Sequence, residues 1–251
     1  MKNIELIKQE NHFGFPACVY KFNKHETLKD KLYEESKLDL TSSQFNSYLR
    51  TNPYEKPILN RGLSAMNSLR EAFEEALNHF YYDVLDAVKD YQPHTRSSVK
   101  PILSTPKITQ SWAVHTQPIN DEHYLNHMNM HTHWLSPVCG SYYLKKPKEL
   151  EGGNLVFANP VFHESMGCQH DSIHMLRDAL VCQGIQRISI CEVEEGNIVL
   201  WAGALPHTIE KIKDSTIERV SIIINSLPST VIKRYDSPYL YGVNTLSPNA
   251  E

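Results

Sequence analysis

Histidines cluster in one short stretch of the sequence, where four of the chain's thirteen lie between residues 123 and 133. Polar and apolar residues alternate in the second part of this stretch, and in a strand side chains two apart share one face. That face would carry His127, Asn129, His131 and His133. Such a face is costly to bury unless something organises it, and neutral imidazole binds iron, zinc and copper strongly. The pattern therefore favours a metal site over an exposed strand face on which histidine is merely tolerated.

His207 supplies a further donor from a distant part of the sequence. It follows an apolar strand, residues 197–201, and a turn of small residues, at the point where the chain re-enters a sheet. With His131 and His133 it completes a candidate set of three metal ligands.

The last apolar segment carries an arginine among β-branched residues. Arg219, Ser221 and Asn225 share one face of the predicted strand, and valine and isoleucine occupy the other. Such an arginine is costly unless it meets an anion, and its guanidinium fork suits a carboxylate that the Ser221 hydroxyl can also reach. Two alternatives remain open at this point: an edge-strand arginine with its charge in solvent, or an ion pair with Glu192 or Glu218.

The elements that would position these residues are mostly strands. After Pro106, short β-like segments alternate with Gly, Pro and Asn, which indicates a sandwich or barrel. The predicted strands are 108–115, 126–134, 138–145, 154–158, 187–193, 197–201, 207–212 and 217–225. Upstream, the pattern predicts a strand-like lead-in over 1–26, a helix over 27–37, a loop over 38–61 and an amphipathic helix over 64–91. Residues 161–186 are predicted to be an insertion with a short helix near 172–181.

The predicted architecture is a single domain spanning residues 1–251. A support region of strand and helices covers 1–106, a jelly-roll core covers 107–226, and a tail covers 227–251. The fold class is therefore mainly β with N-terminal helices.

Composition excludes several classes of protein. The net charge of −4 gives no basic field for nucleic acid or acidic lipid. The five cysteines are scattered and include no C-x-x-C pair, so a disulfide framework or zinc knuckle is not expected. No segment has the length and apolarity of a signal peptide or membrane span. We therefore expect a cytoplasmic protein.

Taken in order, these segments resemble the iron(II)/2-oxoglutarate-dependent oxygenases, and within them the phage-type putative 2-oxoglutarate-Fe(II) oxygenase family. The resembling pieces are His131-Thr132-His133, residues 139–144, 152–160 and 196–201, His207, residues 219–225, and Trp112 on an early strand. The resemblance implies a double-stranded β-helix (jelly roll, cupin-like) that holds one Fe(II) and uses 2-oxoglutarate and O2. It implies a dioxygenase that hydroxylates, or otherwise oxidises, an unactivated C–H bond of a small molecule, with release of succinate and CO2.

The resemblance also assigns metal ligands. His131 and His207 would be iron ligands and catalytic residues. The usual facial triad has a carboxylate two residues after the first histidine, and here His133 stands at that place. Three outcomes follow: a three-histidine site, an open position with His133 swung away, or a carboxylate recruited from Asp121 or Glu122. An open position would also permit halide binding and radical halogenation.

For the cosubstrate, the resemblance implies that Arg219, with Ser221, binds the distal carboxylate of 2-oxoglutarate, which makes Arg219 a third catalytic residue. Tyr143, or its neighbour Tyr142, would add a phenol to this pocket. Asn225 completes the predicted cosubstrate-binding set.

Two other classes of function remain as alternatives. A three-histidine cupin-like dioxygenase would not use 2-oxoglutarate, and Arg219 would then be dispensable. A non-catalytic jelly-roll protein would bind metal without consuming oxygen. The expected partner is a small-molecule substrate, with no nucleic acid and no membrane, and a homodimer is compatible with the sequence. Candidate substrate-recognition residues are His115, His127, Asn129 and Trp134.

Overall fold

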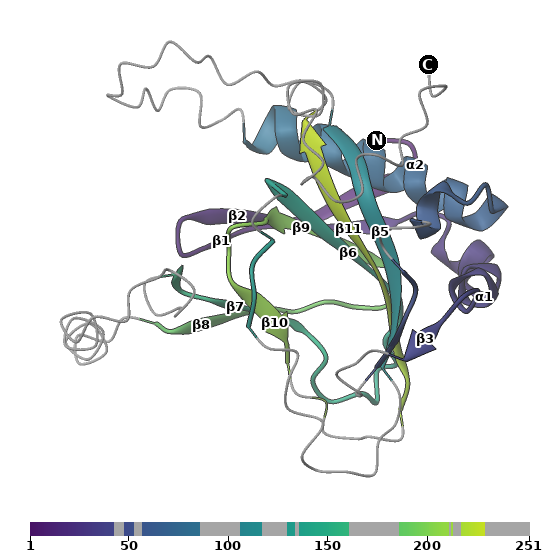
Figure 1. The fold of residues 1–251 in the computed structure, drawn as a ribbon. Helices are drawn as coiled ribbons and strands as arrows, with labels where there is room; N and C mark the ends of the chain where they lie inside the picture. The colour runs from purple at the N-terminus through teal and green to yellow at the C-terminus, as the bar shows by residue number, and fades with distance from the viewer. Residues whose placement is uncertain are drawn as a thin grey trace.

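Two antiparallel sheets form the fold (Figure 1). The computed structural model describes residues 1–42, 48–52, 57–85, 106–116, 130–133, 136–160, 186–210, 212 and 217–228. The main sheet has eight strands in the order β1-β2-β9-β6-β11-β5-β4-β3, and the minor sheet has three in the order β10-β7-β8.

The strand bounds follow chain order. The N-terminal strands are β1 (Ile4–His12), β2 (Phe15–Phe22), β3 (Thr41–Ser42) and β4 (Tyr48–Arg50). The remaining strands are β5 (Pro106–Thr116), β6 (Val138–Lys145), β7 (Leu155–Ala158), β8 (Ile188–Cys191), β9 (Asn197–Ala202), β10 (His207–Ile209) and β11 (Arg219–Pro228).

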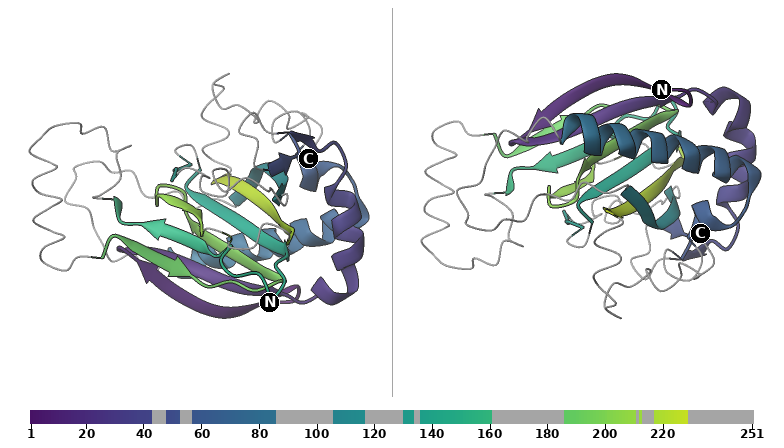
Figure 2. Two further views of the ribbon diagram at one scale, coloured as in Figure 1. Left: turned by 90° about the horizontal axis from the view of Figure 1, so that it is seen from below. Right: turned by 90° about the horizontal axis from the view of Figure 1, so that it is seen from above.

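Helices cover one face of the main sheet, where α2 lies across the strands (Figure 2). The helical elements are α1 (His25–Ser36), the 3-10 turn η1 (Ile58–Asn60), α2 (Ser64–His79) and the π-helical turn η2 (Phe80–Val84). Leu69, Phe73 and Leu77 recur at four-residue intervals and are all buried, so they form the stripe that packs on the sheet.

Two hydrophobic layers lie on the two faces of the main sheet. The layer between this sheet and the helices includes Tyr142 and Ile222. The layer between the two sheets, the inter-sheet layer, includes Tyr143, Phe157 and Trp201. Adjacent tyrosines of β6 thus enter opposite layers, as strand alternation requires. The fold is mainly β with N-terminal helices and a jelly-roll core, as the sequence predicted.

Most predicted elements match the described ones. The helix predicted over 27–37 is α1, and the helix predicted over 64–91 is α2 and η2, with 86–91 outside the described residues. Seven of the predicted strands after Pro106 overlap observed strands; β8 and β10 are shorter than expected. The insertion at 161–185, with its helix near 172–181, lies outside the described residues.

Three predictions need correction. The lead-in is a two-stranded hairpin, β1–β2, whose turn has Phe13 and Gly14 at positive φ. The predicted loop 38–61 contains β3, β4 and η1, because pairing with β5 forms a strand that polar sequence does not indicate. The strand predicted over 126–134 is wrong in its described part, residues 130–133, where His131 makes an isolated bridge to His207.

The support region contributes to both edges of the main sheet. β1 and β2 extend it beyond β9, and β3 and β4 extend it beyond β5. The division into 1–106, 107–226 and 227–251 stays a prediction, and residues 227–228 belong to β11.

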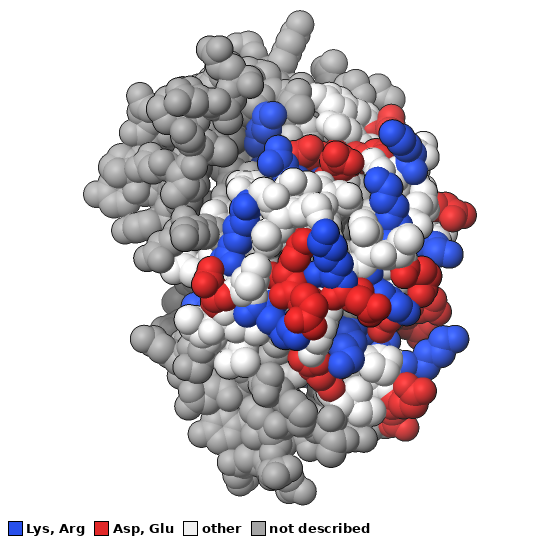
Figure 3. All heavy atoms as spheres, turned by 90° about the vertical axis from the view of Figure 1, so that its right-hand side faces the viewer, with Lys and Arg blue, Asp and Glu red and all other residues white. Residues whose placement is uncertain are grey.

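The surface carries charges of both signs. On the face shown in Figure 3, lysine and arginine side chains are interspersed with aspartate and glutamate, so this face presents no field of a single sign. Among the described residues, no helix combines the length and apolarity needed to cross a membrane.

Glu218 ties the start of β11 to its surroundings. Its carboxylate accepts hydrogen bonds from Tyr33 Oη at 2.8 Å and Lys145 Nζ at 2.9 Å, and it contacts His115 Nδ1 at 3.1 Å. Burial alone would raise the pKa of Glu218, but these three partners lower it below the ordinary 4.5. The ionised Glu218 carboxylate therefore stabilises the fold at any pH above the pKa that it has in the unfolded chain. This stabilisation is lost as the pH falls through the lower pKa that it has in the folded protein.

We expect Glu218→Gln to lower the free energy of unfolding by about 1.5–3 kcal/mol at pH 7, the usual range for hydrogen bonds to a charged group. The deficit should shrink as the pH falls below about 4, because the wild-type carboxylate then becomes protonated too. Denaturant unfolding at both pH values checks this. The matched control is Glu34→Gln, which breaks an exposed pair with Lys37 and should change little. An equal deficit at both pH values would contradict the ionic role of Glu218.

Candidate metal centre

Three histidines converge beside the inter-sheet layer. One ring nitrogen from each of His131, His133 and His207 lies within 4.8 Å of the other two. The Nε2 atoms of His131 and His133 are 3.3 Å apart, and the ring of His207 is 4.5 Å from that of His131 and 5.0 Å from that of His133, centroid to centroid. The structure thus brings together the three histidines that the sequence analysis selected.

Backbone hydrogen bonds hold the three residues in place. His131 and His207 exchange both of their backbone N–H···O bonds, at 3.0 and 2.9 Å, which joins the histidine segment to β10. The backbone N–H of His133 donates to the carbonyl of Gly203 at 2.8 Å. One pair of backbone hydrogen bonds to β10 and one backbone hydrogen bond to Gly203 therefore position these side chains. The sequence had predicted a full strand here.

Aromatic rings orient two of the imidazoles. Trp112 stacks on His133 at 6.1 Å with an interplanar angle of 16°, and Trp201 meets the ring of His207 at 4.9 Å. Two groups reach Nδ1 of His207: the Leu205 carbonyl at 2.9 Å and Trp201 Nε1 at 3.3 Å. One nitrogen cannot donate and accept at once, and the shorter contact favours Nδ1–H donating to Leu205. Nε2 of His207 is then the nitrogen left to bind a metal.

Burial keeps two of these imidazoles neutral. Burial and the charge of His131 lower the pKa of His133 to about 4, although Asn225 acts in the opposite direction. Burial, then the charges of His131 and His133, hold the pKa of His207 well below its ordinary value. Neutral imidazole is the form that coordinates metal, so no proton has to be displaced from these two rings at neutral pH.

The donor set fits a divalent transition metal. Nitrogens about 2.1 Å from a shared ion lie about 3.0–3.4 Å apart, for octahedral or tetrahedral angles. The 3.3 Å between His131 Nε2 and His133 Nε2 falls in this range. Three ligands on one side leave further coordination positions for other molecules, as in non-haem iron oxygenases.

Glycine is required directly after β9, where Gly203 contacts the histidine segment. A Cβ atom on Gly203 would lie 1.8 Å from the Ser136 carbonyl oxygen and 3.0 Å from that of His133. We therefore expect Gly203→Ala to displace the backbone of His133 and to weaken Fe(II) binding by about 10- to 100-fold, as loss of a ligand-orienting contact typically does. Anaerobic Fe(II) titration measures this. The exposed neighbour gives the control, Ala204→Ser, and equal affinities for the two variants would contradict the argument.

Arg219 lies between the sheets with no carboxylate beside it. It is 1% exposed, and within the described residues it makes no ion pair. Its Nε donates to the Gly153 carbonyl at 3.1 Å, its Nη1 donates to Ser221 Oγ at 3.3 Å, and its guanidinium lies 4.9 Å from the centre of the Tyr143 ring. The suggested pair with Glu218 does not form, because that carboxylate binds other partners.

Three polar atoms around this guanidinium are buried and have no hydrogen-bond partner in the part of the chain that the structure describes. They are Arg219 Nη2, Tyr143 Oη and Ser141 Oγ. A Cβ on Gly153, which has a φ of +73°, would come within 3.2 Å of Arg219 Cδ, so glycine keeps this space open. Unsatisfied buried donors are costly, and together these form a cradle for an anion. We call Arg219, Ser221, Tyr143 and Ser141 the arginine pocket.

The residues that the sequence predicted for one cosubstrate pocket lie in different places in the structure. Tyr142 enters the helix layer, where its Oη lies 2.6 Å from His25 Nδ1, so only Tyr143 belongs to the arginine pocket. Ser141 was missed, although two-residue alternation with Tyr143 could have found it. Asn225 lies at the far end of β11, where its Nδ2 donates to Gln110 at 2.6 Å.

Other candidates lie elsewhere. His115 contacts Ser36 Oγ at 2.9 Å on the α1 side and is 1% exposed, so it is no substrate-recognition residue of this centre. His127, Asn129, Trp134, Asp121 and Glu122 lie outside the described residues. Glu192 contributes to a separate surface cavity.

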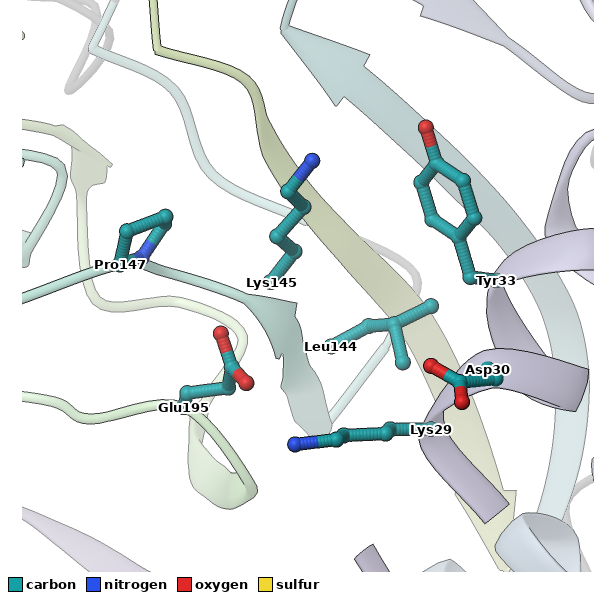
Figure 4. A pocket seen from close by; sticks show the side chains of 7 residues that line it. All are labelled: Lys29, Asp30, Tyr33, Leu144, Lys145, Pro147 and Glu195. Carbon is teal, nitrogen blue, oxygen red and sulfur yellow. The ribbon is translucent and has the colours of Figure 1, made fainter. Parts of the chain in front are cut away.

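A surface hollow beside α1 is not part of this centre (Figure 4). Two lysines and two acidic residues line it with balanced charge, and it contains none of the three histidines. Its lining residues are Lys29, Asp30, Tyr33, Leu144, Lys145, Pro147 and Glu195.

Comparison with known proteins identifies the core. The family model described as "Putative 2OG-Fe(II) oxygenase" matches residues 110–225. The resemblance to the iron(II)/2-oxoglutarate oxygenases is confirmed. Fe(II) and 2-oxoglutarate, predicted as cofactor and cosubstrate, agree with this match, and the matched residues include the three histidines and the arginine pocket.

The solved structures to which this chain is similar are distant in sequence. A 2OG-Fe(II) oxygenase family oxidoreductase from Burkholderia pseudomallei is 12% identical, with a TM-score of 0.48 over 82% of this chain and 79% of that one. HygX from Streptomyces hygroscopicus, with nickel and 2-oxoglutarate bound, is 15% identical, with a TM-score of 0.45 over 85% and 83%. A Pseudomonas putida prolyl-4-hydroxylase is 10% identical, with a TM-score of 0.43 over 87% and 91%. No curated protein sequence matches.

Proposed function

We propose that this oxygenase is an Fe(II)- and 2-oxoglutarate-dependent dioxygenase that hydroxylates an unactivated C–H bond of a small molecule, with release of succinate and CO2. His131, His133 and His207 hold the iron in this proposal, and the arginine pocket holds the distal carboxylate of 2-oxoglutarate.

The observation that carries the proposal is the unpaired charge of Arg219. A guanidinium that is 1% exposed, with Nη2 unpartnered, is stabilised when an anion enters. The neighbouring Ser141 and Tyr143 hydroxyls are also unpartnered and can donate to the same carboxylate. A metal site alone gives no reason to bury this charge, whereas a dicarboxylate cosubstrate does.

Strand register supports the spacing between the two parts of the site. His207 pairs with Phe157 on β7, and Arg219 bonds to the carbonyl of Gly153, four residues earlier. Gly153 precedes β7, which begins at Leu155, and four residues of chain span at most about 14 Å. This distance accommodates a histidine and an arginine side chain with a short dicarboxylate between them.

The residues have separate tasks in the proposed reaction. Iron bound here supplies the activation of O2, coupled to oxidative decarboxylation of 2-oxoglutarate and to C–H oxidation. The three histidines fix the ion, Arg219 and Ser221 orient the cosubstrate, and the buried wall of Trp201 and Phe157 limits access of water.

A small molecule is the proposed substrate class. The net charge of −4 gives no strong overall basic field, and the described residues on the face of Figure 3 mix charges of both signs. We also propose that the support region and the jelly-roll core act as one unit, because strands of the support region complete the main sheet. A cytoplasmic location stays a prediction from the scattered cysteines. The homodimer stays a prediction.

One anaerobic experiment tests the proposed function. Fe(II) followed by 2-oxoglutarate should give the weak visible charge-transfer band of the iron chelate, and admission of O2 should yield succinate. Metal binding without the band would favour a three-histidine dioxygenase that does not use 2-oxoglutarate. Absence of both oxygen consumption and succinate, in metal-loaded protein offered a range of substrates, would favour a non-catalytic metal-binding protein.

A further inference from the structure

A second group of metal-binding side chains lies away from the three histidines. One ligand atom from each of Glu10, His12 and Cys191 lies within 4.8 Å of the other two. His12 is 4% exposed and Cys191 is 0% exposed. The carboxylate of Glu10 is about one-third exposed, so the group faces solvent on one side only.

Neighbouring contacts orient these side chains toward one another. His12 Nδ1 lies 2.8 Å from Ser189 Oγ, and its ring packs 4.6 Å from that of Phe157. Lys8 Nζ donates to Oε1 of Glu10 at 2.9 Å. The other nitrogen of His12 and the other oxygen of Glu10 therefore turn inward toward Cys191.

The inward atoms of His12 and Glu10 face one another and Cys191. His12 Nε2 and Glu10 Oε2 are buried and 3.3 Å apart, within ion-pair distance, but neither makes a hydrogen bond of standard geometry with a described residue. A simple ion pair would align a proton between them. A shared third atom explains the arrangement better, because unsatisfied buried polar groups are costly.

The donor types and spacing match zinc. Zn²⁺ binds imidazole nitrogen, thiolate sulfur and carboxylate oxygen at about 2.0–2.3 Å, and tetrahedral ligands at such distances lie about 3.3–3.7 Å apart. The 3.3 Å separation of His12 Nε2 and Glu10 Oε2 is already that of two ligands of one ion. We propose that Glu10, His12 and Cys191 bind a Zn²⁺ ion, with water in the fourth position.

The position of this group in the fold indicates what the ion does. β1 is an edge strand of the main sheet and β8 is an edge strand of the minor sheet. Glu10 and His12 lie on β1, Cys191 ends β8, and no strand pairing joins these two strands. Bound Zn²⁺ thus links the two sheets at their open edge and is a structural ion, separate from the iron of the oxygenase reaction.

Cobalt substitution tests the proposal with a signal that the three-histidine centre cannot give. Co²⁺ bound to a thiolate has a near-ultraviolet sulfur-to-metal charge-transfer band, and His131, His133 and His207 contain no sulfur. We expect this band in the wild-type protein and in His131→Ala. We expect Cys191→Ser to abolish it and Cys18→Ser, which changes another buried cysteine, to retain it.

Zinc affinity gives the second measurement. In the His131→Ala background, Zn²⁺ should bind at one ion per chain and raise the thermal midpoint. Cys191→Ser and His12→Gln should each weaken that binding by at least about 100-fold, since even loss of a ligand's hydrogen-bond partner costs about 10- to 100-fold. Circular dichroism of the metal-free variants establishes that they are folded. Cobalt binding without the sulfur band, or a band that persists in Cys191→Ser, would overturn the proposal.

Discussion

His207→Ala is expected to abolish formation of the Fe(II)–2-oxoglutarate chelate and to reduce succinate formation to background. Loss of a hydrogen-bond partner of a ligand costs about 10- to 100-fold in metal affinity, and loss of the ligand itself should exceed that. The visible chelate band is the readout, because only iron that also binds 2-oxoglutarate produces it. The backbone bonds between His207 and His131 do not depend on the side chain, so the local chain path should persist.

His79→Ala is the matched control for that experiment. His79 is half-buried on the helix side of the main sheet, where its Nδ1 atom lies 2.9 Å from Tyr20 Oη. Because this is the face away from the three histidines, the His79→Ala substitution should leave the chelate band unchanged. A full-strength band in His207→Ala would show that the three histidines are not the iron site.

His133 requires a pair of substitutions, because the sequence pattern leaves its role open between ligand and open position. With its Nε2 atom 3.3 Å from that of His131, we expect it to be a ligand. His133→Ala should then weaken Fe(II) binding by about 100-fold, and His133→Asp should restore part of the affinity by recreating two histidines and a carboxylate. Wild-type affinity in His133→Ala would instead support an open coordination position.

The sequence predicted the candidate site better than the path of the chain that forms it. Spacing and strand alternation selected His131, His207, Arg219 and Ser221, because side-chain chemistry is local information. The strand expected around His131 was wrong in its described part, since alternation cannot tell a strand from an extended segment held by one bridge. Which other segment of the chain the histidine segment pairs with is decided by the tertiary fold, and the local sequence does not show it.

The arginine pocket shows the same limit. Sequence alone left Arg219 open to pairing with Glu218, its chain neighbour. In the fold, the Glu218 carboxylate contacts three other side chains instead: Tyr33 of α1, His115 of β5 and Lys145 of β6. That Arg219 has no carboxylate partner among the described residues therefore depends on three distant elements, which no local sequence pattern indicates.

Arg219→Met is expected to raise the KM for 2-oxoglutarate by about 30- to 4,000-fold. Removing one member of a buried, hydrogen-bonded charge pair costs about 2–5 kcal/mol, and each 1.4 kcal/mol is a factor of ten. Arg219→Lys should recover only part of the loss, because an ammonium cannot reproduce the guanidinium fork. Ser221→Ala should cost about tenfold, since it removes one neutral hydrogen-bonding group.

The stability of the cosubstrate-free protein separates this role from a structural one. Arg219 is buried with no counter-ion among the residues that the structure describes, so Arg219→Met removes a charge together with two hydrogen bonds. We expect its free energy of unfolding to stay within about 1 kcal/mol of wild type, because apolar replacement of buried charge is often neutral or stabilising. The rise in thermal midpoint on adding 2-oxoglutarate, present in the wild type, should disappear.

A truncated cosubstrate tests the contact between Arg219 and the distal carboxylate by changing the ligand. 2-Oxopentanoate keeps the oxoacid end of 2-oxoglutarate and lacks the distal carboxylate, so it should bind wild type and Arg219→Met with equal, weak affinity. The two changes, one in the protein and one in the ligand, then form a cycle whose coupling energy isolates the contact between guanidinium and carboxylate. Losses that simply add would mean that Arg219 supports the fold and does not touch the cosubstrate.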